Sequence, residues 1–173
     1  MIIGGKKQIV VANIKQAIIE RDFSAKVETD DPQLTAAQRQ AVIDQYLRRD
    51  QTRWSRLNHW IARSIANIMT HELNRHTTVV GLENLTAVKA GGIITSNHFN
   101  PLDNTAIRYA TRKAHRKHLF IVSEETNLAM PGMVGYLMRH CDTMPITTDM
   151  TYMGRIFPQR LQQVLQQNEL ILI

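Results

Sequence analysis

The sequence predicts an α/β fold, in which a mostly parallel or mixed sheet is flanked by helices. After residue 76, short apolar runs rich in β-branched residues alternate with stretches of helical periodicity, and this alternation is typical of strand–helix–strand units. Before residue 76, helical periodicity prevails. We therefore expect a helical N-terminal lobe at residues 1–75 and an α/β domain at residues 76–173.

Three helices are expected in the N-terminal lobe. The first covers residues 8–20, and the second covers residues 36–50, where Thr35 and Gln38 form a capping box at its start. The third, at residues 53–73, carries an apolar stripe with arginines beside it, so it would either lie on a membrane interface or pack on the sheet domain. The stripe consists of Trp54, Leu57, Ile61, Ile65 and Ile68.

Five strands and three helices are expected in the α/β domain. The β-branched and aliphatic runs place strands at residues 77–85, 91–98, 118–123, 143–148 and 169–173. Helices are expected at residues 100–114, 130–140 and 158–167. Asn100 and Pro101 suit the N-cap and the first position of the first of these helices, and Pro158 suits the first turn of the last one.

The composition indicates a globular protein with an anionic partner. A chain of 173 residues that is 43% hydrophobic can bury a core of its own. The single cysteine, Cys141, rules out an internal disulfide and fits a reducing compartment. The net charge of +6 favours nucleic acid, a phospholipid surface, or an acidic carrier or cofactor as partner. The sequence has neither a bilayer-spanning apolar run nor a signal peptide, so we expect an intracellular protein.

His98 and Asp103 stand where a predicted strand turns into a helix, which is where open α/β sheets bind ligands. Asp103 falls in the first turn of the helix, so the His98 ring can fold back toward its carboxylate. Such a pair fixes the tautomer of the imidazole and leaves the other ring nitrogen free to accept a proton. Capping of the helix alone also explains an aspartate at position 103. The spacing is therefore compatible with a catalytic pair and with a purely structural role of Asp103.

The residues around this pair resemble a known family. The stretch VVGLENLTAVKAGGIITSNHFNPLD is similar to the signature of the glycerolphosphate and lysophosphatidic-acid acyltransferases, in which Asn100 replaces the usual serine. The stretch MPGMVGYLMRHCDTMPITTD resembles the second block of that family, and the resemblance covers about residues 50–173. The matching positions are Gly81, Glu83, Asn84, Leu85, Ser96, Asn97, His98 and Asp103.

The resemblance implies an O-acyltransferase of phospholipid biosynthesis with a glycerolphosphate-acyltransferase-like fold. His98 would be the general base that takes the proton from an acceptor hydroxyl as it attacks an acyl thioester, and Asp103 would orient it. Asn97 and Asn100 would contact the substrate. The donor would be acyl-CoA or acyl carrier protein, and the acceptor a lysophospholipid or a glycerol phosphate. The family needs neither a metal nor a bound cofactor, and we expect a cytoplasmic protein, peripheral on the inner face of the membrane.

Two departures from the family favour an alternative. Thr147, Thr148 and Asp149 stand where an arginine usually holds the phosphate of the acceptor, which disfavours a glycerol-phosphate acceptor. The Phe-Pro-Glu-Gly block of the family is absent and would follow a strand such as residues 169–173, so we expect a fragment. The alternative function is a catalytically incomplete basic protein that binds anionic lipid or acyl carrier protein.

Three further features of the sequence bear on function. The basic segment at residues 108–117 is either a solvated helix face or a dock for coenzyme A phosphates, carrier protein or anionic lipid, and Arg108 and Arg112 would then bind the substrate. It lacks the interleaved aromatic residues of a nucleic-acid site.

His71 and His76 lie five apart, which is not the metalloprotease spacing. The third feature is a group of methionines, whose helical spacing favours a place in the core over the wall of an acyl-chain groove. These residues are Met130, Met133 and Met138.

Overall fold

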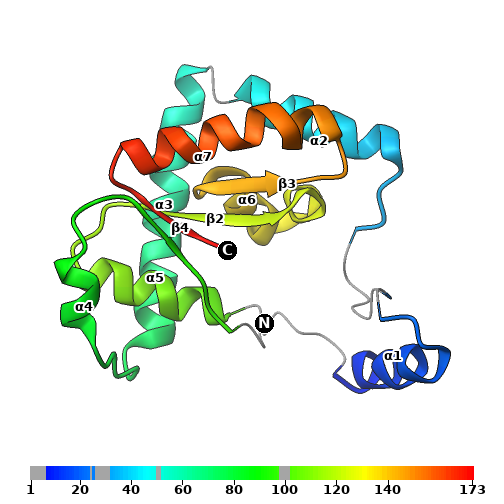
Figure 1. Cartoon of the computed structure of the whole chain (residues 1–173), viewed down its shortest axis with the longest axis horizontal. Coiled ribbons are helices and arrows are strands. Elements are labelled where there is room, and N and C mark those ends of the chain that lie inside the picture. The colour runs from blue at the N-terminus through cyan, green and yellow to red at the C-terminus, as the bar shows by residue number, and fades with distance from the viewer. Residues whose placement is uncertain (1–6, 24, 26–31, 50–51, 98–101) are drawn as a thin grey trace.

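Four parallel strands form the centre of the molecule (Figure 1). The computed structural model describes residues 7–23, 25, 32–49, 52–97 and 102–173. The strand order is β1-β4-β2-β3, so all carboxyl ends lie at one edge of the sheet. The strands are β1 (Gly92–Ile94), β2 (Leu119–Glu124), β3 (Thr143–Ile146) and β4 (Leu170–Leu172). The predicted α/β class is confirmed, and the sheet is purely parallel among the described residues.

Helices cover both faces of the sheet. Helices α2 (Ala36–Arg49) and α7 (Phe157–Gln166) lie on one face, while α5 (Asp103–Lys113) and α4 (Leu82–Ala87) lie on the other (Figure 1). Helix α3 (Arg53–Asn74) packs on α5 and on α6 (Gly132–His140). The short 3₁₀ helix η1 (Glu125–Ala129) follows β2, and the π-helix η2 (Tyr152–Ile156) leads into α7. Helix α1 (Lys7–Glu20) lies apart from the sheet and its helices (Figure 1).

The core consists of two clusters, one on each face of the sheet. Ile171 points toward α7 and α2 and packs with Ile43 and Val164. Its neighbours Leu170 and Leu172 point to the opposite face and pack with residues of α4 and α5. Successive side chains of a strand alternate between faces, so the three residues of β4 contribute to both clusters. Burial of both faces explains the unbroken apolar run at residues 170–173.

The capping box at the start of α2 is confirmed. The backbone amide of Gln38 donates to the Thr35 hydroxyl over 3.3 Å, and the amide of Thr35 donates to the Gln38 side chain over 2.8 Å. Each side chain thus satisfies an amide that has no partner within the helix. The helix ends at Arg49, within one residue of the end expected from the sequence.

The strand predicted at residues 77–85 is wrong. Residues 77–79 have no regular structure, and α4 begins at Leu82 after Gly81, whose φ of 76° requires a glycine-like conformation. The β-branched run suggested a strand, but Val80 is exposed and pairs with none of the strands that the structure describes. Tertiary context therefore overrides β propensity at this position.

A partly buried ion pair connects α3 to the amino-terminal end of β3. The Arg63 guanidinium donates to Asp142 through Nε at 3.0 Å and Nη2 at 2.6 Å, and the Asp142 side chain is fully buried. Asp142 has a φ of 56°, a conformation that aspartate tolerates better than most residues. His118 lies beside the pair, with Nδ1 3.8 Å from an Asp142 carboxylate oxygen.

His118 predicts a loss of stability on the acid side. Burial lowers the pKa of His118, and the positive charge of Arg63 lowers it further. The carboxylates of Asp142 and Glu169 act in the opposite direction but do not outweigh these effects. The unfolded chain takes up a proton near pH 6.5, before the folded chain does, so the free energy of unfolding should fall as the pH drops below that value. We expect His118→Gln to flatten this fall in urea titrations between about pH 5 and 7.5. The exposed His76 provides the control; an unchanged slope in His118→Gln would contradict the assignment.

Candidate active site

An apolar cleft of about 700 Å³ opens at the carboxyl ends of the strands. It lies between α3, α5, α6 and the sheet, on the face opposite α7. Open parallel sheets bind ligands at this edge. Residues that line it include Met69 and Leu73 of α3, Thr105 and Arg108 of α5, Val134 and Met138 of α6, Ile121 of β2 and Leu172 of β4.

Methionines supply much of the apolar wall of the cleft. Met130, Met133 and Met138 all line it, together with Met69 from α3. The expectation that the first three belong to the core is wrong, because none of them is buried and Met133 is 55% exposed. Thioether side chains are flexible and fit apolar ligands of irregular shape. The clustering of methionines in the sequence was the signal that could have identified this wall.

The start of α5 is fixed at the mouth of the cleft by side-chain hydrogen bonds. The Asn74 side-chain amide of α3 donates to the Thr105 hydroxyl over 2.9 Å, and this hydroxyl donates to the Leu102 carbonyl over 2.7 Å. Helix α5 begins at Asp103 with Leu102 as its N-cap, two residues later than the cap expected at Asn100. These contacts position the first turn of α5, including Asp103, relative to α3.

A comparison with family models identifies the domain that carries this cleft. The model described as Acyltransferase matches residues 76–173, which is more than half of the chain. The chain belongs to the acyltransferase family. The matched range is the domain of the glycerolphosphate and lysophosphatidic-acid acyltransferases. No curated protein and no solved structure matches the chain.

The expected catalytic pair of the acyltransferase is described only in part. His98 and Asn100 lie outside the described residues. Asp103 is half-buried in the first turn of α5, between Leu102 and Asn104, which both line the cleft. Asn97 is exposed at the end of the loop after β1, and its neighbour Ser96 lines the cleft. The described residues on both sides of His98 thus lie at the mouth of the cleft.

The two arginines expected to bind substrate lie in different places. The side chain of Arg108 is buried, lines the cleft and donates to the Leu119 carbonyl over 3.2 Å. Arg112 is exposed and lines a second groove of about 610 Å³ between α3 and α5, together with His71, Tyr109 and Lys113. The cleft and the groove lie on different sides of the contact between these helices.

Gly135 and Arg139 hold α6 against η1. Both α6 and η1 contribute residues to the wall of the cleft. A β-carbon at Gly135 would lie 1.6 Å from the Met130 carbonyl oxygen, so only glycine allows this close approach. Arg139 donates to the carbonyls of Leu128 and Met130 at 2.9 and 3.0 Å. These contacts place the Met130 side chain in the cleft.

A second ion pair attaches α2 to η1. Arg39 of α2 donates to the Glu125 carboxylate, which is fully buried, and lies 3.6 Å from that of Glu124. The hydrogen bond with Glu125 raises the pKa of Arg39. The turn after β2 is therefore anchored from the face of the sheet opposite the cleft.

The thiol of Cys141 lines the cleft but is not activated. Burial raises the pKa of Cys141, so the thiol stays protonated at neutral pH and is a poor nucleophile.

Within the described part of the chain, no three His, Cys, Asp or Glu side chains gather as metal ligands would.

Asp149 ends the stretch after β3 in which the sequence resemblance led us to expect an arginine. Its carboxylate accepts from the amides of Thr151 and Tyr152 at 2.8 and 3.2 Å. These are the amides at the start of η2, and an anion bound there would have to displace the carboxylate. The described residues after β3 therefore offer no phosphate site of this kind.

Proposed function

We propose that this acyltransferase moves a fatty acyl group from an acyl thioester to a lipid-like hydroxyl acceptor. The observation that carries the proposal is the methionine-lined cleft, which opens at the start of α5, next to Asp103. An acyl chain in this cleft would bury its methylene groups against apolar side chains. Its thioester would then lie at the carboxyl edge of the sheet.

In the proposed reaction, His98 removes the proton from the acceptor hydroxyl. The hydroxyl oxygen attacks the thioester carbonyl, and the tetrahedral intermediate then expels the thiolate, which takes up the proton from His98. Asp103 fixes the imidazole tautomer and stabilises its charged form. The support for these roles is the sequence resemblance around His98 and the placement of Asp103 in the first turn of α5. General-base assistance of this kind contributes about 10²–10⁴-fold in rate.

The acceptor in this proposal is a lysophospholipid rather than free glycerol phosphate. The carboxylate of Asp149 accepts the amides at the start of η2, which disfavours a phosphate at that position. A lysophospholipid brings its own apolar chain, so it depends less on a tightly held phosphate. The donor is acyl-CoA or acyl carrier protein, with the exposed cations at the end of α5 available to either.

We place this reaction in phospholipid biosynthesis, at the inner face of the cytoplasmic membrane. The net charge of +6 supports an anionic surface as partner. None of the described helices is long and apolar enough to cross a membrane.

Thioester consumption with a panel of acyl donors and acceptors tests the proposal. We expect release of free thiol that depends on the acceptor, and acylated lipid as product. Binding of acyl carrier protein or anionic lipid without turnover would instead support the alternative, a basic protein without catalysis.

Met138→Ala should change the preferred length of the acyl chain. The substitution enlarges the cleft, and one methylene group in an apolar pocket changes specificity by about tenfold or more. We expect kcat/KM to shift toward longer acyl chains. Met150→Ala is the matched control, because Met150 is an exposed methionine outside the cleft. An identical chain-length profile in the two variants would remove the acyl chain from this cleft.

A further inference from the structure

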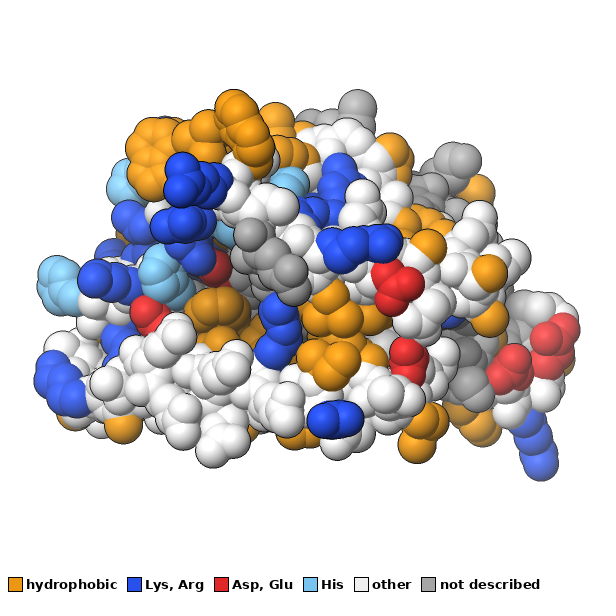
Figure 2. Space-filling view, turned by 90° about the horizontal axis from the view of Figure 1, so that it is seen from above, with side chains coloured by type: hydrophobic (Ala, Val, Ile, Leu, Met, Phe, Trp, Pro, Cys, Tyr) orange, Lys and Arg blue, Asp and Glu red, His pale blue; other side chains and the backbone are white. Residues whose placement is uncertain are grey.

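A buried arginine lines the inner part of the cleft. Arg108 of α5 is 8% exposed, and no other Lys or Arg among the described residues is buried. Exposed Lys and Arg side chains are spread over the surface, as Figure 2 shows for one face of the molecule, and water stabilises their charges. The charge of Arg108 has little access to water, so it depends on partners inside the protein or in the cleft.

The protein leaves most of the hydrogen-bonding capacity of Arg108 unused. A guanidinium group carries five N–H donors, and that of Arg108 makes a single hydrogen bond to the described residues, from Nη2 to the Leu119 carbonyl over 3.2 Å. No carboxylate of these residues forms an ion pair with it. The carboxylate of Asp142 is bound by Arg63 instead. A buried cation in this state calls for an anion, and the cleft gives an anion access to it.

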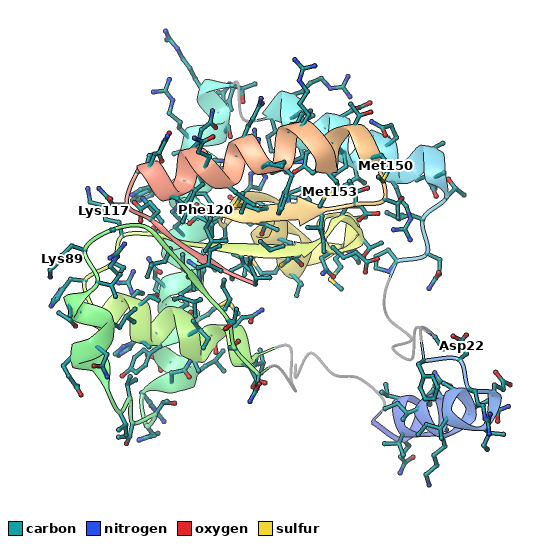
Figure 3. All side chains as sticks on the ribbon, viewed as in Figure 1. Asp22, Lys89, Lys117, Phe120, Met150 and Met153 are labelled. Carbon is teal, nitrogen blue, oxygen red and sulfur yellow. The ribbon has the colours of Figure 1, made fainter. Side chains whose placement is uncertain are left out.

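The hydrogen bond of Arg108 leads to the amino-terminal edge of the sheet, because Leu119 is the first residue of β2. Figure 3 shows Lys117, which precedes β2, and Met150, which follows β3, at opposite ends of the sheet. Since β1 runs parallel to the other strands, Asn97, which follows β1, belongs to the same edge as Met150. Arg108 and the predicted catalytic motif thus lie at different ends of the cleft.

Two estimates give the distance between these ends. Along β2, Leu119 is five residues from Glu124 at the carboxyl edge, which corresponds to about 16 Å. Along α5, Arg108 is five residues from Asp103, which is about 7.5 Å of helix axis, and the arginine side chain extends further. The guanidinium group therefore lies roughly 10–16 Å from the edge where the thioester would react.

This distance selects the part of a substrate that can reach Arg108. The attacking hydroxyl and the phosphate of a lysophospholipid are joined by a few bonds of the glycerol backbone, on the order of 5 Å, so the phosphate is too close to the reacting atoms. An extended acyl chain advances about 1.3 Å per methylene group. A chain of roughly eight to twelve carbon atoms would therefore bring its distal end to the guanidinium group.

We propose that Arg108 forms a polar subsite at the inner end of the cleft, which selects acyl groups that carry a carboxylate at their distal end. The carboxylate accepts hydrogen bonds from the free N–H groups of the guanidinium, while the methylene groups contact the methionine-lined wall. A plain hydrocarbon chain of the same length would bring a methyl group to the cation and leave its charge unpaired. Only the direction of the acyl chain in the cleft rests on the proposed function.

Calorimetric titration with matched donors tests the subsite. The full chain is titrated with dodecanoyl-CoA and with the mono-CoA thioester of dodecanedioic acid, without an acceptor, so that binding is measured in the absence of turnover. We expect the dicarboxylic thioester to bind about 10- to 100-fold more tightly, as a charge-assisted hydrogen bond allows. Equal or weaker binding would overturn the subsite. An affinity that rises steadily up to the thioester of hexadecanedioic acid would overturn it too, because the chain would then pass the cation.

Arg108→Met removes the charge and leaves an unbranched apolar side chain. This variant should bind the two thioesters about equally, and a preference that survives in it would overturn the subsite. Arg56→Met is the matched control, because Arg56 is an exposed arginine of α3 that does not line the cleft; it should keep the full preference. Circular dichroism verifies that Arg108→Met is folded. If it is not, the two thioesters still decide the question in the unchanged protein.

Turnover separates the subsite from the proposed function. With a lysophospholipid as acceptor, kcat/KM should show the same preference for the dicarboxylic donor. Tighter binding of this donor without any turnover would support the subsite and count against the proposed function alone. A loss of affinity for lysophosphatidate in Arg108→Met, with an unchanged acyl preference, would assign Arg108 to the acceptor and overturn the subsite.

Discussion

Replacing His98 by alanine is expected to lower turnover about 10²–10⁴-fold, with little change in the affinity for the acyl donor. The substitution removes the proposed base but leaves the methionine-lined cleft intact. Steady-state kinetics of thiol release, with kcat and KM determined separately, provide the measurement. His76→Ala is the matched control, since His76 is an exposed histidine beyond the end of α3.

Asp103→Asn tests the second member of the pair. The amide keeps the shape of the side chain but removes the charge that would orient His98, so kcat should fall while the fold is preserved. Full activity in either His98→Ala or Asp103→Asn would remove that residue from the mechanism.

Replacing Arg63 by leucine is expected to destabilise the protein by about 3–5 kcal/mol, because it leaves the buried Asp142 carboxylate without its cation. The measurement is the free energy of unfolding from urea denaturation. Arg56→Leu, an exposed arginine on the same helix, should have little effect.

The double variant Arg63→Leu with Asp142→Asn isolates the cause of this loss. Asparagine tolerates the positive φ of residue 142 and carries no charge, so it should restore most of the stability. If the double variant is as unstable as Arg63→Leu, the loss comes from packing of the arginine and not from the uncompensated charge.

Most of the fold could be predicted from local sequence patterns. The capping box placed α2 correctly, and the apolar runs placed four strands within a few residues. The error at residues 77–85 arose because a β-branched run resembles a strand even when no neighbouring strand is available to pair with it. Residues 82–87 form a helix because Gly81 provides its N-cap in the left-handed conformation and Glu83 lies in its first turn.

The site could be predicted only where a motif marks it. The resemblance predicts His98 and Asp103 as the catalytic pair, and Asp103 lies between two residues that line a cleft. The clustering of methionines was compatible with a cleft, but helical spacing could not decide whether Met130 and Met138 line it, since the spacing gives the direction of a side chain and not what lies opposite. The same limit applies to α3: its stripe was evident in the sequence, but which face turns inward depends on contacts such as Arg63–Asp142, which join residues far apart in the chain.

The strand order has a consequence for synthesis on the ribosome. β4 lies between β1 and β2, yet it follows both of them in the chain, and β1 pairs with no other described strand. Until β4 emerges, β1 has no partner and β2 has one open edge. Non-local pairing of this kind slows folding and leaves apolar strands exposed in the meantime. A nascent chain arrested after β3 should therefore bind chaperones. The four-stranded sheet should form only when Leu170–Leu172 has left the exit tunnel.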